Sequence, residues 1–189
     1  DRLTYWDLLP NVLRNQFLLF LPSLILHAFL TDGQRAYHTA PLQPPRFIIF
    51  ILQFLGMYLA YEVVFYYGHR LLHHRLIYSS WHKQHHSTFG SVGISGQYAT
   101  SIDFLVMHTL PVWFGIFVVN PAPPSLWLFE IIGSLNSIHS HGGYMFPFWP
   151  SIQDHWMHHA SHSGVNFGTG PLDWLHGTTD LSRAVKRKS

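Results

Sequence analysis

The sequence predicts an all-α integral membrane protein, a helical bundle with about four transmembrane or membrane-embedded helices. Three observations lead to this fold class. Charged residues make up 11% and hydrophobic residues 48% of the 189 residues, whereas a soluble domain has about 25% charged residues. Four apolar stretches follow one another along the chain. The 16 histidines gather mostly in the polar segments that separate or follow these stretches.

The apolar stretches cover residues 17–30, 47–67, 104–119 and 125–138. A helix that crosses a bilayer needs about 20 residues, with about 17 as the lower limit. Only the second stretch exceeds that length easily, so we expect two helical hairpins in which not every helix spans the membrane fully. The segment Pro121-Ala-Pro-Pro124 predicts a sharp break between the third and fourth helices.

The basic residues predict how the bundle is oriented. Arg70, Arg75 and Lys83 follow the second stretch, and further basic residues lie in the C-terminal tail. Cytosolic loops are enriched in lysine and arginine, so segments 68–103 and 139–189 should both face the cytosol. The alternative is a soluble domain with a buried helical core, but four apolar runs would leave so short a chain little polar surface.

Composition also excludes several classes of function. The chain has no cysteine, which rules out disulfides, a thiolate nucleophile and a cysteine metal site. The net charge is +2 and no basic stripe is present, so we expect no nucleic-acid partner. The length predicts a single domain over residues 1–189. Because the first residue is Asp1 and not methionine, we expect the N-terminus to be truncated.

Histidine clusters carry the functional signal. They are His69-Arg-Leu-Leu-His73-His74, His82-Lys-Gln-His85-His86 and His155-Trp-Met-His158-His159, with His139 and His141 between the second and third. Residues three or four apart on a helix share a face, so each cluster is expected to project two or three imidazoles in one direction. Neutral imidazole binds iron, zinc, copper and nickel, and its ordinary pKa near 6.5 leaves it largely unprotonated at pH 7.

The number of histidines predicts two metal ions. A structural zinc ion takes about four ligands, whereas nine histidines qualify here: His69, His73, His82, His85, His86, His141, His155, His158 and His159. Helical di-iron proteins usually also use glutamate ligands, but residues 63–102 contain no acidic residue. We therefore expect a site made of nitrogen ligands. A weak, exposed histidine chelator is the alternative.

Three more histidines are weaker candidates. His74 lies five residues after His69, off the shared face, and His162 is followed closely by the helix-breaking Gly164. His139 and His141 lie two residues apart and cannot both point one way, and we favour His141 because the following glycines permit close backbone approach. We interpret the remaining histidines as ordinary hydrogen-bonded polar groups: His27, His38, His108 and His176.

These motifs resemble those of the fatty acid hydroxylase/sterol desaturase superfamily of membrane oxygenases. The histidine clusters are similar to its three histidine boxes, with residues 69–178 as the catalytic region. Further similar segments are Gln97-Tyr98 followed by Asp103, His141-Gly-Gly-Tyr144, Asn166-Phe167-Gly168, Leu172-Asp173-Trp174 and Gly177-Thr178. The middle and closing segments look most like those of sterol C-4 methyl oxidases and cholesterol 25-hydroxylases.

The resemblance implies a di-iron hydroxylase or desaturase that oxidises a membrane lipid with O2. It implies a cytosol-facing site at the endoplasmic reticulum and electrons from NAD(P)H through cytochrome b5 or a similar carrier. A sterol is the favoured substrate, and a fatty acyl chain, a sphingoid base or a small natural product is the alternative. Trp156 stands where the third box usually has aspartate, and Thr100-Ser101 stands where many members have His-Pro, so the substrate stays open.

Two further alternatives concern the role of the metal and of the aromatic residues. A histidine-rich metal transporter would place its ligands within the spans, whereas these clusters lie just outside them; a non-catalytic protein with structural metal is a third reading. Several aromatic residues either line a lipid slot or anchor the protein at the membrane interface: Tyr66, Tyr67, Trp81, Tyr98 and Trp156.

Overall fold

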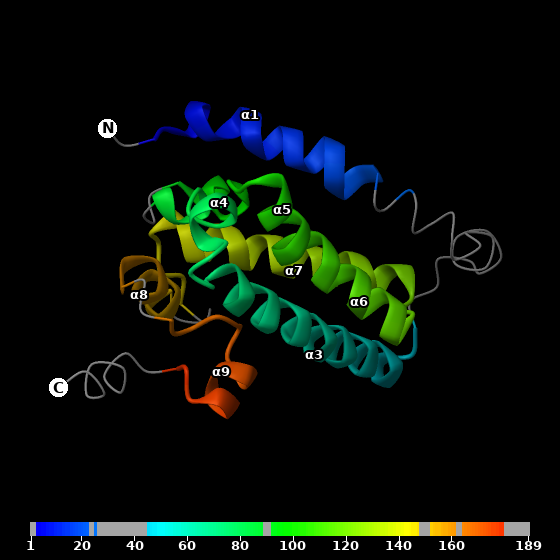
Figure 1. Cartoon of the computed structure of the whole chain (residues 1–189). Coiled ribbons are helices and arrows are strands. Elements are labelled where there is room, and N and C mark those ends of the chain that lie inside the picture. Colours follow the sequence, from blue (N-terminus) through cyan, green and yellow to red (C-terminus); the bar gives the residue numbers. More distant parts are fainter. Residues whose placement is uncertain are drawn as a thin grey trace.

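The computed structural model describes residues 3–22, 25, 45–88, 92–147, 152–161 and 164–179, which form helices and loops without a strand (Figure 1). The helices are α1 (Tyr5–Asn15), η1 (Gln16–Phe20), α3 (Phe47–Leu72), α4 (Tyr78–Trp81), η3 (His85–Ser87), η4 (Gly93–Gln97), α5 (Ser101–Phe104), η5 (Leu105–Thr109), α6 (Leu110–Val119), α7 (Pro123–Gly142), α8 (Gln153–Ser161) and α9 (Pro171–His176). The all-α fold class is thus confirmed for the described residues.

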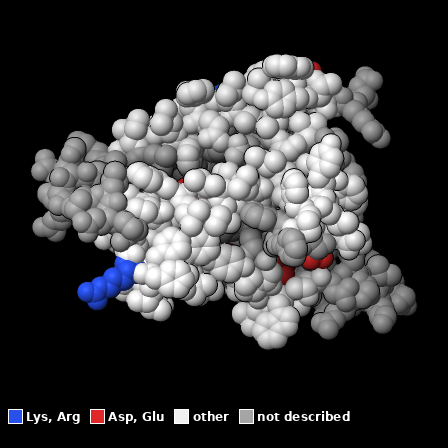
Figure 2. All heavy atoms as spheres, turned by 180° about the vertical axis from the view of Figure 1, so that it is seen from behind, with Lys and Arg blue, Asp and Glu red and all other residues white. Residues whose placement is uncertain are grey.

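Two of the described helices are long and apolar enough to cross a membrane. They are α3, with 26 residues, and the continuous helix α5–η5–α6 over Ser101–Val119, with 19 residues. At about 1.5 Å per residue, α3 is about 39 Å long. The face seen in Figure 2 is almost free of charged side chains among the described residues. These helices bear out the second and third predicted stretches.

The helices pack through small residues and a shared apolar core. A Cβ atom on Gly115 of α6 would lie 3.1 Å from the Met57 side chain of α3, so the two helices touch at this point. Met57 is fully buried and belongs to a cluster with Val112, Ile116, Leu126 and Phe129. The cluster joins α3, α6 and α7. Burial of apolar side chains therefore holds α3 and α7, which carry His69 and His141, together with α6.

The other two predicted spans are not established. Helix α7 has 20 residues, but Glu130 and several serines make it too polar to count as a candidate span. The first stretch is described only up to residue 22 and at residue 25. The break at the prolines is confirmed, because α6 ends at Val119 and α7 begins at Pro123. Four membrane helices therefore remain a prediction.

All histidine clusters lie at one end of the bundle. Helix α3 runs toward this end, α6 runs away from it and α7 returns, so that α4, α8 and α9 gather there (Figure 1). The α6–α7 connection lies at the opposite end. Helix α1 is joined to the loop before α5 by a hydrogen bond from the Asn15 side chain to the Ala99 carbonyl, 3.0 Å long. Which end faces the cytosol remains a prediction.

Single cysteines can test this topology, because the chain has none of its own. Ser79→Cys lies at the histidine end and Ala122→Cys in the connection at the opposite end. We expect a membrane-impermeant maleimide to label position 79 from the cytosolic side and position 122 only after the membrane is permeabilised. Labelling of both positions from one side of sealed vesicles would contradict the arrangement.

Candidate metal centre

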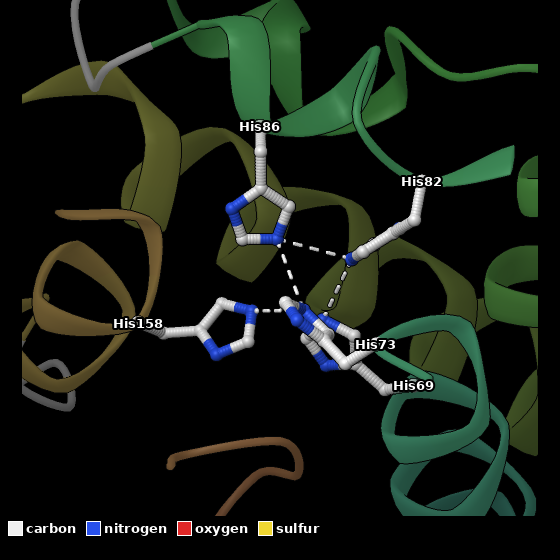
Figure 3. A group of neighbouring side chains, drawn as sticks. All are labelled: His69, His73, His82, His86 and His158. Atoms are coloured by element: carbon white, nitrogen blue, oxygen red, sulfur yellow. Dashed lines mark hydrogen bonds between the residues drawn. The ribbon is translucent and has the colours of Figure 1, made fainter. Parts of the chain in front are cut away.

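Nine histidines come together in two adjacent groups. Site I consists of His69, His73, His82, His86 and His158 (Figure 3), and site II of His85, His141, His155 and His159. Within each group, one ring nitrogen from every histidine lies within 4.8 Å of the others. These nine are the same residues that the sequence selects as metal ligands. That they bind metal is proposed below from their geometry.

The ring nitrogens of site I converge on one point. Figure 3 shows five imidazoles that point toward each other from α3, from α8 and from the segment around η3. Adjacent Nε2 atoms are 3.1 Å apart in four pairs: His69–His82, His82–His86, His86–His73 and His73–His158. Two imidazole nitrogens bound at right angles to one ion, each at about 2.1 Å, lie about 3.0 Å apart. The spacing of site I therefore suits a coordinated metal ion.

Hydrogen bonds outside site I fix which nitrogen carries the proton. The Nδ1–H groups of His69 and His158 donate to the carbonyls of Phe167 and Val165, at 2.6 and 2.7 Å. The Nδ1–H of His82 donates to the Asp103 carboxylate at 2.9 Å. A neutral imidazole has one donor and one acceptor nitrogen, so the Nε2 atoms of these histidines are bare acceptors. The two acceptors of His69 and His82 face each other at 3.1 Å and repel, and a cation between them removes the conflict.

Site II shows the same features with fewer outer hydrogen bonds. The Nε2 atoms of His155 and His141 are 2.8 Å apart. The Nδ1–H of His141 donates to the Ser137 carbonyl one turn earlier in α7, at 2.9 Å. Neither ring nitrogen of the buried His159 is in hydrogen-bonding geometry with another group. Buried polar atoms are rarely left unpaired, so a ligand that takes up a lone pair fits this position.

As expected, each cluster projects at least two imidazoles in one direction, but in the second and third clusters the third imidazole belongs to the other site. In α8, His155 and His159 belong to site II, whereas His158 belongs to site I. In a helix, position i+4 lies about 40° from position i, but i+3 lies about 60° to the other side. The second cluster divides in the same way at His85, although the chain there is a turn followed by η3. Each of these clusters therefore contributes to both sites.

The other described histidines lie outside both groups. His74 is exposed, and its Nδ1 accepts a hydrogen bond from the Leu76 N–H. His139 is buried in α7 and packs against Phe146, with ring centroids 5.4 Å apart. His176 stacks on Tyr66. The predictions for His27, His38 and His162 fall outside the described residues. His108 is stacked on Phe104 and lies in neither group.

Several supporting residues were missed by the sequence analysis. The tightest approach to the His141 ring is made by Gly96, which the sequence analysis did not single out. A Cβ atom on Gly96 would lie 2.8 Å from the Nδ1 atom of His141, whereas one on Gly142 would meet nothing within 3.7 Å. The hydrogen bond from His82 to Asp103 was not foreseen either. In the sequence, the only indication of this bond is that Asp103 is an acid directly before the apolar stretch 104–119.

The electrostatics keep these imidazoles neutral. Burial, together with the neighbouring imidazoles, lowers the pKa of His85, His86, His155 and His159 below the ordinary value. A neutral imidazole presents the free lone pair that a metal ion needs, and bringing several cationic imidazoles together would cost Coulomb energy. In the metal-free protein, the imidazoles are therefore already in the neutral form that binds a cation.

Replacement of the histidine partner Asp103 should weaken metal binding. Asp103→Asn keeps the shape of the side chain but removes the charge that polarises His82, and the loss of such partners typically costs about 10- to 100-fold in metal affinity. We expect this loss in metal titrations of the purified protein, with Asp154→Asn, an exposed acid beside His155, as the control. Equal affinity in the two variants would refute the role of Asp103.

Acid should destabilise the metal-free protein. The pKa values of His85, His155 and His159 in site II are lower in the folded state than in the unfolded state, where they are near 6.5. The unfolded chain therefore binds more protons as the pH falls below about 6.5, and stability is lost in that direction. Thermal unfolding between pH 7.5 and 5 measures this. An unchanged midpoint temperature over that range would contradict the neutral, buried imidazoles.

Comparisons with known proteins agree with this geometry. The sequence profile of the fatty acid hydroxylase family matches residues 54–178, which include all nine histidines of the two sites. Human fatty acid hydroxylase domain-containing protein 2 is 34% identical over 177 residues, which cover 93% of this chain and 52% of the human protein. This chain therefore spans about half the length of that relative. No solved structure matches the chain.

Two further relatives carry names that state an activity. Very-long-chain aldehyde decarbonylase GL1-11 from Oryza sativa subsp. indica is 30% identical, over 88% of this chain and 66% of the rice protein. Methylsterol monooxygenase 1 from Gallus gallus is 26% identical, over 97% of this chain and 64% of the chicken protein. The match of the family profile to most of the chain, with the identity to these relatives, shows that the chain belongs to the fatty acid hydroxylase family.

Proposed function

We propose that this protein is an O2-dependent membrane lipid oxidoreductase whose nine clustered histidines hold two iron ions, one at site I and one at site II. The observation that carries the proposal is the convergence of imidazole nitrogens in two adjacent groups at the end of an apolar bundle. Nitrogen ligands accept both iron and zinc. Iron is chosen because relatives of this chain include a methylsterol monooxygenase, and oxygenation needs a redox-active metal.

When bound, two iron ions supply the reduction of O2 and the oxidation of a C–H bond. A hydroxylation balances as lipid C–H, O2, NAD(P)H and a proton giving lipid C–OH, water and NAD(P)+. The chain itself orients the imidazoles through the Phe167, Val165 and Ser137 carbonyls and the Asp103 carboxylate. Its helices also exclude water from the centre, which protects a reactive site from side reactions.

The surface around the candidate spans suits a lipid substrate. Between α3 and α6 lies an open groove of about 370 Å³ that is lined only by apolar side chains: Val64, Leu110, Trp113, Phe114 and Phe117. Its α3 wall lies little more than one helical turn from His69. Of the aromatic residues considered for a lipid slot, Tyr66 is fully buried against Phe167 and His176 and leaves no room for a lipid there.

The substrate is proposed to be a sterol, with a long acyl chain as the alternative. The chicken methylsterol monooxygenase supports the first and the rice very-long-chain aldehyde decarbonylase the second. We further propose that the site faces the cytosol at the endoplasmic reticulum and receives electrons from cytochrome b5 or a similar carrier. Arg70, Arg75 and Lys83 are exposed at the histidine end, where an acidic carrier protein would be attracted.

Lipid analysis with labelled oxygen tests the function. Cells that express the protein under ¹⁸O2 should accumulate an oxidised lipid that carries the label, if the product is a hydroxylated one, or a newly desaturated lipid. His85→Ala removes a site II ligand and should abolish the product, because the second ion loses one of four nitrogens. His74→Ala, an exposed histidine outside both groups, is the matched control and should keep it.

The same lipid profile separates the two substrate classes. An altered sterol fraction supports the sterol proposal, and an altered acyl or aldehyde fraction supports the alternative. Identical lipids in cells with wild type, His85→Ala and no protein would argue for a non-catalytic metal-binding protein instead.

A further inference from the structure

The loop and short helix at residues 164–178, which we call the clasp, supply two of the outer contacts of site I. The Phe167 carbonyl accepts a hydrogen bond from His69 in α3, and the Val165 carbonyl accepts one from His158 in α8. One segment thus orients imidazoles from two different helices. In the described part of site II, His141 is oriented from within α7 by the Ser137 carbonyl and not by the clasp.

Two buried carboxylates hold the clasp in place. Asp173 accepts hydrogen bonds from the Phe167 N–H at 2.9 Å, the Gly168 N–H at 2.6 Å and the Thr178 hydroxyl at 2.6 Å. It therefore fixes the peptide unit next to the carbonyl that orients His69. The side chain of Asp173 is 2% exposed, so these charge-assisted bonds are not weakened by water.

The second carboxylate, Glu62, comes from the middle of α3. Its Oε2 atom accepts hydrogen bonds from the N–H and the hydroxyl of Thr169, at 2.8 and 2.7 Å. Its Oε1 atom accepts one from the Leu172 N–H at 3.1 Å. Glu62 is 1% exposed, and a charge in an apolar helix is costly unless its partners are provided. All three partners belong to the clasp.

The fit between Glu62 and the clasp is close. A Cβ atom on Gly168 would lie 2.5 Å from the Oε1 atom of Glu62, so a side chain at this position would displace the carboxylate. Gly168 follows Phe167 directly. A short path of bonds therefore leads from Glu62 through Thr169 and Gly168 to the Phe167 carbonyl and on to the Nδ1 atom of His69.

We infer that Glu62 is a positioning residue for site I: by anchoring the clasp, it holds the Phe167 and Val165 carbonyls against His69 and His158 and so sets the metal affinity of site I, but not of site II. The inference rests on the proposed occupation of both sites by metal. A carboxylate is needed at position 62 because both of its oxygens accept hydrogen bonds from N–H or O–H groups. The amide of glutamine would place an NH2 donor against one of those donor groups.

Metal titration of purified Glu62→Gln in detergent tests this, with Co²⁺ as the probe and its visible absorption as a second readout. We expect one of the two ions to bind about 10- to 100-fold more weakly with an altered spectrum, and the other to bind as in wild type. Glu130→Gln is the matched control, because Glu130 is a half-buried acid of α7 that makes no hydrogen bond with the described residues of the clasp, and it should leave both affinities unchanged.

Two backgrounds identify the affected ion. With site II disabled by His155→Ala, Glu62→Gln should weaken the remaining ion; with site I disabled by His73→Ala, it should not. Equal weakening of both ions, or wild-type affinity for both, would overturn the inference. If Glu62→Gln fails to fold, Gly168→Ala displaces the same carboxylate, and loss of helical circular dichroism in both variants would show a purely structural role. A wild type that binds two ions but oxidises no lipid would refute only the proposed function.

Discussion

The structure depends on one electrostatic constraint: the Nε2 atoms of His69 and His82 face each other at 3.1 Å with no proton between them. His69, His82 and His158 each commit their Nδ1–H to an outer acceptor, which leaves bare Nε2 atoms facing the other imidazoles of site I. Those atoms lie 3.1 Å from a neighbouring ring nitrogen. Burial favours the neutral form here as well, since it holds the pKa of His86 in site I below the ordinary value. A shared cation is the arrangement that stabilises such a set.

The fold serves this constraint by bringing the ends of several helices together. The apolar core around Met57 fixes α3 against α6 and α7, so that the histidine-bearing ends of α3 and α7 meet at one side of the bundle. The division of the second and third clusters between the two sites then places the sites next to each other, with the rings of His86 and His159 stacked at 4.4 Å. Adjacent ions are what a reaction that uses two metals requires.

Much of the site could be predicted from the sequence because helical spacing is periodic. The pairs His69–His73 and His155–His159 lie four residues apart and do share a site. The assignment of His85 and His158 to the other site could not be predicted, because spacing alone does not tell which side of the helix faces which group. The role of the Phe167 and Val165 carbonyls as hydrogen-bond acceptors could not be predicted either, since every residue has a carbonyl and only the fold shows where it points.

The fold class followed from composition and hydropathy, whereas the number of spans did not, because helix α7 mixes apolar and polar side chains. The central claim, that the nine histidines hold two redox-active ions, is tested most directly by the metal content of protein purified without oxygen and without added metal, measured by mass spectrometry. The account predicts about two iron ions per chain. A single tightly bound zinc ion, or no metal in a folded chain, would contradict it.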